Sequence, residues 1–151
     1  MVTPAGALAD PAMRIGARAI DNFINLFVYF VFAFIVAVAL GGGIFVSLVL
    51  TLLLIFGWEF GWLSAKQATP GKLLLGQKVI GENGSEITNE IAFIRAAVWT
   101  GPWILGALFW PLGFLGWLAV VGGSTVLLFT DKVKHQSVMD KLSKTVVVST
   151  K

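Results

Sequence analysis

The chain has 151 residues, of which 57% are hydrophobic and 13% are charged, with a formal net charge of +3 and a mean hydropathy of +0.87. A soluble domain carries roughly 25% charged residues, so these values predict an integral membrane protein and argue against a soluble or nucleic-acid-binding one. Cysteine is absent and His135 is the single histidine, which excludes disulfides and cysteine-based metal sites and disfavours a histidine-built metal centre.

Residues 1–13 lack a basic segment followed by a long apolar run, the pattern of a secretory signal. Pro4 and Pro11 oppose helix formation there. We therefore expect a short disordered cytoplasmic lead, followed by a single membrane domain over residues 14–149.

The first predicted span, residues 19–40, is preceded and overlapped by the polar stretch RIGARAIDNFIN. At 100° per residue, its four polar positions Arg14, Arg18, Asp21 and Asn25 fall within about 60° of one another on one helix face. A polar stripe entering a membrane needs a partner. We expect Arg14 itself to lie at the surface, where its long side chain reaches water.

The second predicted span, residues 44–63, follows a turn at Gly41–Gly43. Near its end, Gly57 and Gly61 form a GxxxG motif, which lets helix backbones approach closely in lipid. The motif predicts either a homo-oligomer interface or close packing within the chain. The six tryptophans are expected to be interfacial anchors.

Residues 64–90 form a polar loop in which KLLLGQKVI and GENGSEIT predict a hairpin turning at Asn83–Gly84. Thr88 or Asn89 is expected to cap the next helix. The segment QATPGK resembles the end of a phosphate-binding loop. It lacks the required glycine, since Lys66 stands there, and Leu73 replaces the required hydroxyl residue, so no nucleotide site is expected.

Residues 91–130 are apolar except for breaks at Gly101–Pro102 and near Pro111. They predict two further spans, 91–109 and 112–130. An interfacial helix over residues 91–100, followed by shorter spans, is the alternative. The tail, residues 131–151, is polar, and its KTVVVS segment is expected to form a strand that pairs with the hairpin.

The predicted fold is therefore an all-α membrane protein, a four-helix transmembrane bundle with a small cytoplasmic β-hairpin or sheet. With four spans, all 11 lysines and arginines fall on one side or at helix ends near it, and the two opposite turns carry none. The positive-inside rule then places both termini in the cytoplasm, and we expect a multi-pass protein of the inner (plasma) membrane.

Four ionisable residues lie within the predicted spans or at their edge, all near the cytoplasmic leaflet: Arg18, Asp21, Glu59 and Arg95. Such residues are costly in lipid and normally face protein or water. They predict either an ion or proton path or a buried ion-pair cluster that fixes helix register. The outer half of the first two spans holds no polar residue beyond Ser47 and Thr51, which favours the cluster.

No nucleophile elbow, zinc-protease motif or other catalytic constellation is present, so we do not expect an enzyme, and we expect neither a cofactor nor a metal.

Three segments, in this order, resemble the RDD family of small bacterial membrane proteins, named for one arginine and two aspartates. RIGARAID maps the arginine to Arg14 and the first aspartate to Asp21, and KHQSVMDKLSKTVVV maps the second aspartate to Asp140. Met139 and Lys144 depart from the histidine and glycine that family members often carry there. Between these two segments, QATPGKLLLGQKVI is similar to the family's TPGK segment, here Thr69, Pro70, Gly71 and Lys72, and Arg95 falls where many members carry an arginine.

The resemblance covers about residues 12–149 and implies membrane location and architecture more than activity. It also suggests the missing partner: Asp140, from the tail, would fold back against Arg14. Asp21 would then pair with Arg18 or with Arg95.

These residues fit two main functions. The first is an accessory or scaffold component whose charge cluster holds the cytoplasmic half of the bundle. The second is a small ion- or proton-coupled transporter acting as an oligomer, with Asp21 and Glu59 as cation or proton sites. A third, weaker interpretation is a lipid-related modulator, since a basic cytoplasmic face attracts anionic headgroups. The expected partners are the lipid bilayer, a second copy or a membrane complex, and not nucleic acid.

Overall fold

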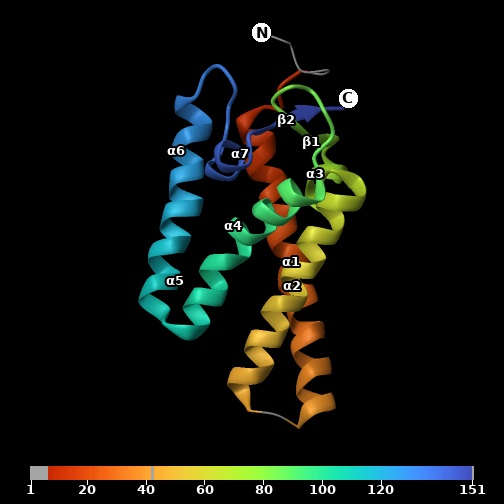
Figure 1. Ribbon diagram of the computed structural model, residues 1–151, viewed down its shortest axis with the longest axis vertical. Helices are drawn as coiled ribbons and strands as arrows, with labels where there is room; N and C mark the ends of the chain where they lie inside the picture. The colour runs from red at the N-terminus through yellow and green to blue at the C-terminus, as the bar shows by residue number, and fades with distance from the viewer. Residues whose placement is uncertain (1–6, 42, 151) are drawn as a thin grey trace.

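The structure is a computed structural model in which residues 7–41 and 43–150 are described (Figure 1). Helices dominate these residues, and two short strands form one small sheet. The helices are α1 (Pro11–Leu40), α2 (Ile44–Lys66), α3 (Pro70–Leu74), α4 (Asn89–Leu108), α5 (Trp110–Trp117), the π-helical segment η1 (Leu118–Gly122), α6 (Gly123–Thr130) and α7 (Val138–Ser143); the strands are β1 (Gln77–Gly81) and β2 (Thr145–Ser149).

Four helices of the described chain are long and apolar enough to cross a bilayer: α1, α2, α4 and the continuous run α5–η1–α6. The predicted helical membrane protein with four candidate spans and a small sheet is confirmed at this level. The two-span interpretation of residues 91–130 fits, because α4 continues as one helix through Pro102. The break falls at Phe109, which is extended with φ −152°, and α5 begins at Trp110.

The beginning of α1 differs from prediction. The Asp10 carboxylate accepts hydrogen bonds from the N–H groups of Ala12 (2.8 Å) and Met13 (3.2 Å), and so caps the helix. Pro11 occupies the first turn, where its missing N–H is not needed. Residues 7–9 also pair with β2, through Ala9 N–H to Val147 O at 2.9 Å. The expected disordered lead is therefore wrong for residues 7–13, and residues 1–6 lie outside the described residues.

The sheet agrees with the sequence patterns. β1 and β2 are antiparallel, with a register from Gln77 opposite Ser149 to Gly81 opposite Thr145. The expected turn follows β1: the Gly84 N–H donates to Gly81 O at 2.9 Å, and Gly84 has φ +83°, a conformation that favours glycine. The strand in KTVVVS, its pairing with β1 and the turn are therefore confirmed, as is the Thr88 cap of α4. The predicted hairpin is only partly formed, because its second arm is not a strand and meets β1 in a single bridge between Ile80 and Glu86.

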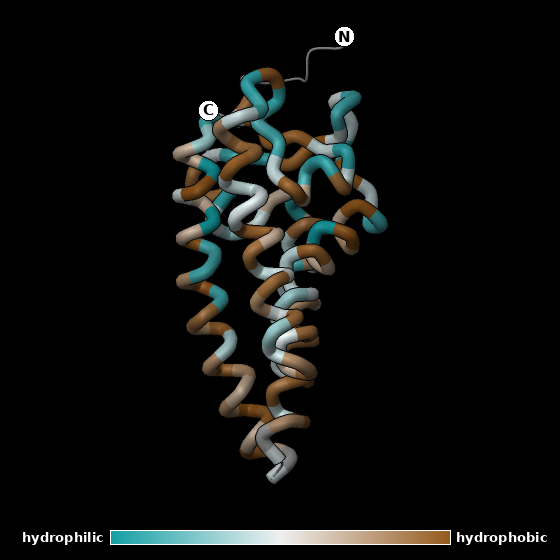
Figure 2. The backbone as a smooth tube through the Cα atoms, turned by 90° about the vertical axis from the view of Figure 1, so that its left-hand side faces the viewer, coloured by the Kyte–Doolittle hydropathy of each residue, from teal (hydrophilic) through white to brown (hydrophobic). Residues whose placement is uncertain are grey.

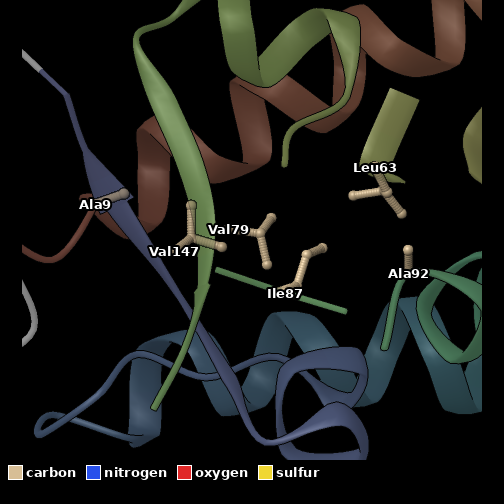
Figure 3. Close-up of a cluster of buried hydrophobic side chains, with 6 residues drawn as sticks. All are labelled: Ala9, Leu63, Val79, Ile87, Ala92 and Val147. Carbon is tan, nitrogen blue, oxygen red and sulfur yellow. The ribbon is translucent and has the colours of Figure 1, made fainter. Parts of the chain in front are cut away.

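The sheet packs against the helices through a small apolar core (Figure 3). Val79 and Val147 face one another across the two strands, and Leu63 of α2 and Ala92 of α4 close the cluster. The core thereby ties the sheet to the ends of two different helices. Its buried members are Ala9, Leu63, Val79, Ile87, Ala92 and Val147.

The molecule has two unlike ends. Figure 1 shows α3, α7 and both strands at the end where α1 begins, and the α1–α2 turn at the opposite end. Hydrophilic residues gather toward the first of these ends (Figure 2). We call the end with α3, α7 and the sheet the polar end and the end with the α1–α2 turn the apolar end.

Candidate functional site

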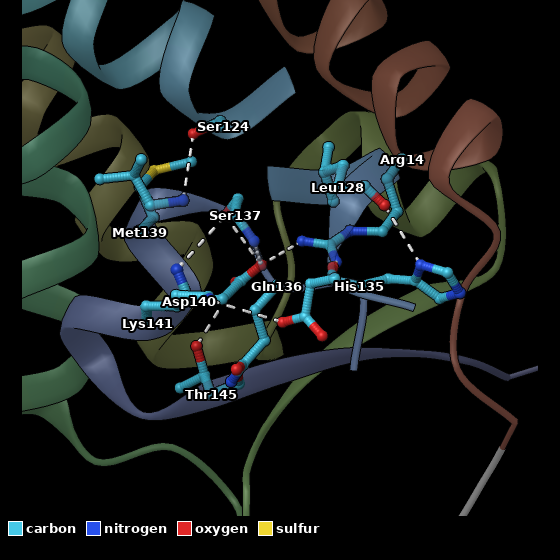
Figure 4. A network of polar contacts seen from close by, with 12 residues as sticks. Arg14, Ser124, Leu128, His135, Gln136, Ser137, Met139, Asp140, Lys141 and Thr145 are labelled. Carbon is cyan, nitrogen blue, oxygen red and sulfur yellow. Dashed lines mark hydrogen bonds and ion pairs between the residues drawn. The ribbon is translucent and has the colours of Figure 1, made fainter. Parts of the chain in front are cut away.

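The site begins with Asp140, which is completely buried in the short helix α7. Ser137 caps this helix in a reciprocal capping box with Asp140. One carboxylate oxygen, Oδ2, accepts from the Ser137 N–H at 2.9 Å and from the Ser137 hydroxyl at 2.7 Å (Figure 4). The local sequence SVMD thus orients the Asp140 carboxylate through contacts within α7 and its cap.

Two arginines from distant helices converge on this carboxylate. Arg95 of α4 donates from Nη1 to Oδ1 at 2.6 Å, and Arg14 of α1 forms an ion pair with Oδ2. Arg14 also donates to the His135 carbonyl, and Arg95 also donates to Thr145 of β2. The predicted contact between Arg14 and Asp140 is confirmed. The expected surface position of Arg14 is wrong, since only 7% of it is exposed.

Asp140 is held as an anion. Burial alone would raise the pKa of this carboxyl group. Arg95, Arg14 and the Ser137 N–H outweigh burial and hold the pKa of Asp140 well below its ordinary value of 3.8. We call Asp140 with Arg14 and Arg95 the tail cluster, because the carboxylate comes from the polar tail.

A second group of charges lies next to it and is centred on Arg18, which we call the loop cluster. Nη1 of Arg18 donates to Oε1 of Glu59 in α2 at 2.7 Å and lies 3.7 Å from Oδ2 of Asp21. Asn25 of α1 also lies beside Glu59. The guanidinium lies 3.7 Å from the ring centre of Trp99, a cation–π contact. The predicted polar stripe therefore meets carboxylates and an aromatic ring within the protein.

Asp21 has an unexpected main partner, the loop after α2. Oδ2 accepts from the Thr69 hydroxyl at 2.5 Å and Oδ1 accepts from the Gly71 N–H at 2.7 Å. A Cβ atom on Gly71 would collide with the backbone oxygen of Ala17, so only glycine allows this approach. Of the two expected partners of Asp21, Arg18 is in contact, whereas Arg95 binds Asp140 instead.

Lys72 completes the loop cluster and was missed as a buried charge. It lies in α3, started by Pro70, and is only 6% exposed. Nζ donates to the Thr69 hydroxyl at 3.3 Å. Burial, with Arg18 and Arg95 nearby, lowers the pKa of Lys72 from 10.5 to about 8, although Asp21 and Glu59 act in the opposite direction. The sequence singled out Thr69-Pro70-Gly71-Lys72 only through its resemblance to the RDD loop segment, which does not indicate that Lys72 is buried.

The comparison with known families decides the classification. A family model described as the RDD family matches residues 8–144, most of the chain. The chain belongs to the RDD family. No curated protein and no solved structure matches it. In this RDD chain the three residues expected from the family motif divide between the clusters: Arg14 and Asp140 are in the tail cluster, and Asp21 is in the loop cluster.

Toward the apolar end of the RDD chain, two buried threonine hydroxyls donate hydrogen bonds to carbonyl groups of their own helices. Thr51 donates to the Ser47 carbonyl of its own helix at 2.7 Å, and Thr100 donates to the Ala96 carbonyl at 2.8 Å. Among the described residues, the polar side-chain contacts of the two clusters thus do not continue to the apolar end. Nor do those residues contain a group of three or more metal-ligating side chains.

The GxxxG motif lies on the outside of the RDD bundle. Ideal Cβ atoms on Gly57 and Gly61 would meet nothing within 4 Å. Both glycines line an open groove of about 340 Å³ on α2, whose other lining residues are Trp58, Trp62, Ala65 and Lys66. Close packing of the motif within the chain is therefore wrong, and the homo-oligomer interface stays a prediction. The expectation for the tryptophans is wrong at Trp99, which is buried.

Proposed function

We propose that this RDD protein is a non-catalytic accessory or scaffold component of the plasma membrane, in which the buried arginine–aspartate clusters fix one half of the bundle. The observation that carries the proposal is the double ion pair of Asp140. It connects Arg14 of α1 to Arg95 of α4, so the tail joins two membrane helices that are far apart in sequence.

The buried charged groups are bound to one another within the protein, which supports a structural role. The Asp140 carboxylate is fully buried and accepts from two arginines and from Ser137. A substrate or ion would have to displace these donors. Removing one partner of a buried pair typically costs about 3–5 kcal/mol, so such a displacement is unfavourable. A scaffold gains from the same arrangement, because the polar half of the bundle is held in a single geometry.

The proposed orientation has both termini in the cytoplasm. It rests on the distribution of basic residues: the turn at Gly41–Gly43 and the turn around Phe109 carry no lysine or arginine. The sheet and α7 would then face the cytoplasm, where they offer a folded surface to a soluble or membrane partner.

Transport is the second candidate, and one observation favours it. Asp21, Glu59 and Lys72 are three buried titratable groups in one cluster, next to Arg18, which is 17% exposed through its side chain. Groups of this kind mark proton or ion pathways in many membrane proteins. Because the polar contacts stop halfway along the described helices, a path would need a second copy or a partner chain.

Photo-crosslinking in the native membrane tests the scaffold proposal. A photoreactive residue replaces Gly61 of α2, where no side chain of the protein contacts the position. Gly122, another glycine with open surroundings but on the α5–α6 run, is the matched control position. We expect a stoichiometric partner to be recovered in mild detergent and to be crosslinked from position 61 in the groove on α2, but not from position 122. A protein that always purifies alone and uncrosslinked contradicts the proposal.

Proteoliposomes test transport directly. Purified protein is reconstituted around a pH-sensitive dye and challenged with Na⁺ or K⁺ gradients. The scaffold proposal predicts no flux above empty vesicles. Cation-dependent proton flux that is lost in Asp21→Asn but kept in Asp131→Asn, a carboxylate outside both clusters, would replace it with the transport function.

A further inference from the structure

Lys72 is a buried cation without a direct ion partner. No carboxylate oxygen of the described residues lies within 4.0 Å of its Nζ, which instead donates a hydrogen bond to the neutral hydroxyl of Thr69. The other six charged groups of the two clusters all take part in ion pairs. Lys72 therefore differs from every other charge in the network.

The charges around Lys72 do not balance. Arg18 and Asp21 face it from α1, Glu59 from α2 and Arg95 from α4. Together with Arg14 and Asp140, the network holds four basic and three acidic side chains. When Lys72 is protonated, one buried positive charge has no counter-ion, and a buried charge without a partner is unfavourable. When it is neutral, the network balances.

The same lysine belongs to the contact that holds the loop on the first helix. Its Nζ donates to Thr69 at 3.3 Å, and the Thr69 hydroxyl donates to Asp21 at 2.5 Å. The neighbouring Gly71 N–H donates to the other Asp21 oxygen at 2.7 Å. Docking of α3 on α1 and burial of Lys72 are therefore one event: if α3 moves away, Lys72 enters water.

We propose that Lys72 is a proton-binding site that controls how tightly α3 docks on α1. The docked loop tightens when Lys72 releases its proton to water and loosens when it takes a proton up. This device goes beyond the proposed scaffold function and does not depend on it. It would let the cytoplasmic face of the protein respond to a mildly alkaline pH.

The direction in which pH changes the docking of α3 follows from the two pKa values of Lys72. The pKa of Lys72 is about 8 when α3 is docked, against 10.5 for the lysine in water. The undocked state therefore binds more protons between these values, and docking becomes more favourable as pH rises. Below pH 8 both states are protonated and docking is at its weakest. Between pH 7 and pH 9, the equilibrium constant for opening should fall about tenfold.

Hydrogen exchange at the Gly71 amide measures this opening. The full chain in lipid nanodiscs is followed between pH 7 and pH 9, and each rate is corrected for the intrinsic pH dependence of exchange. We expect the protection of this amide to rise about tenfold in the wild type. Lys72→Met, which cannot titrate, should give a flat profile. Lys66→Met removes an exposed lysine at the end of α2 and should keep the wild-type rise.

A flat wild-type profile, or a rise that persists in Lys72→Met, overturns the proposal. A second measurement keeps it testable if that variant does not fold. The ¹³Cε resonances of the lysines are titrated in the wild-type protein. One lysine should titrate near pH 8, and that resonance should disappear in Lys72→Arg. If every lysine titrates above about pH 10, the range of a free lysine, the proposal is wrong.

Discussion

The polar and apolar halves of this RDD bundle are held in different ways. In the polar half, ion pairs link α1 to α2 and to the tail, and link the tail to α4, and the charged groups are largely buried. In the apolar half, large side chains point outward: Phe34 is 71% exposed, Val38 68% and Phe45 55%. The buried Thr51 hydroxyl in α2 bonds to its own helix.

The difference follows from the solvent. Lipid is as apolar as leucine, so burying one apolar side chain against another gains little inside a membrane. Ion pairs and hydrogen bonds between helices are not replaced by lipid, because lipid offers no partner. We therefore expect the polar half to determine the arrangement of the helices, and the apolar half to tolerate substitution. The predictions below compare matched changes in the two halves.

The largest effect is expected for Asp140→Asn. The substitution keeps the shape of the side chain but leaves Arg14 and Arg95 buried with no anion between them. We expect a loss of about 3–5 kcal/mol of folding free energy, measured by thermal unfolding in detergent or as loss of monodisperse protein. Asp131→Asn removes a partly exposed ion pair with Lys141 at 3.7 Å, and its amide oxygen can still accept from the Val133 and Lys134 N–H groups, so it should cost less than about 1 kcal/mol.

Acid should reproduce the Asp140 substitution in the wild type. The pKa of Asp140 is depressed below 3.8 in the folded state, so its stabilising effect is fully present above the unfolded value. It is lost progressively as pH falls below about 4. Unfolding curves between pH 6 and pH 2 should show this loss. A wild-type curve that keeps its midpoint throughout that range would contradict the ionised, ion-paired state of Asp140.

The next effect concerns two glycines. Gly71→Ala places a methyl group against the Ala17 carbonyl and beside the Asp21 carboxylate, so α3 must lift off α1. Overpacking of this kind should cost about 2–3 kcal/mol. Gly61→Ala, in the open groove on α2, meets nothing within 4 Å. We expect that change to leave the unfolding midpoint unaltered or to raise it slightly, because alanine favours the helix. Equal losses at both positions would contradict the comparison.

The contact between Arg14 and Asp140 was predictable from the resemblance to the RDD family, which maps the family's arginine and second aspartate onto these two residues. The predicted topology supported it, because it places the tail on the side of the membrane where the first span begins. The position of Arg95 was equally visible, but its choice between Asp21 and Asp140 was not. That choice depends on where α4 lies relative to α7: the capping-box spacing of Ser137 and Asp140 can be read in the sequence, but the position of Arg95 beside Asp140 cannot.

The loop cluster shows what remained hidden. The main partners of Asp21 are a hydroxyl and a backbone N–H in residues 69–71, and a backbone donor leaves no mark in the pattern of charges. Lys72 was hidden for a related reason, since a lysine in a polar loop is normally exposed. The helix ends also differ in how far they could be predicted. The cap of α4 by Thr88 was predicted, whereas the cap of α1 by Asp10 was missed because Pro11 was expected to oppose a helix.

The smallest and most direct comparison uses one substitution in both halves, threonine to valine, which preserves shape and removes the hydroxyl. Thr69 and Thr51 are both buried, with 1% and 0% exposed. Thr69→Val takes a donor from the charged Asp21 and an acceptor from Lys72, and bonds to charged groups are worth about 1.5–3 kcal/mol. We expect a loss near the lower end of this range, about 1.5–2 kcal/mol.

Thr51→Val removes a hydrogen bond from the hydroxyl to the Ser47 carbonyl, which also accepts within the backbone of the helix. The loss of folding free energy should therefore be below about 0.5 kcal/mol. For a chain of this size, 1 kcal/mol corresponds to a shift of roughly 2–4 °C in the unfolding midpoint, so the two variants are distinguishable in one thermal series. Their difference isolates the link between a hydroxyl and the charge network, because burial and side-chain shape are matched. If Thr51→Val costs as much as Thr69→Val, the apolar half depends on polar contacts as strongly as the polar half does, and the division between the two halves fails.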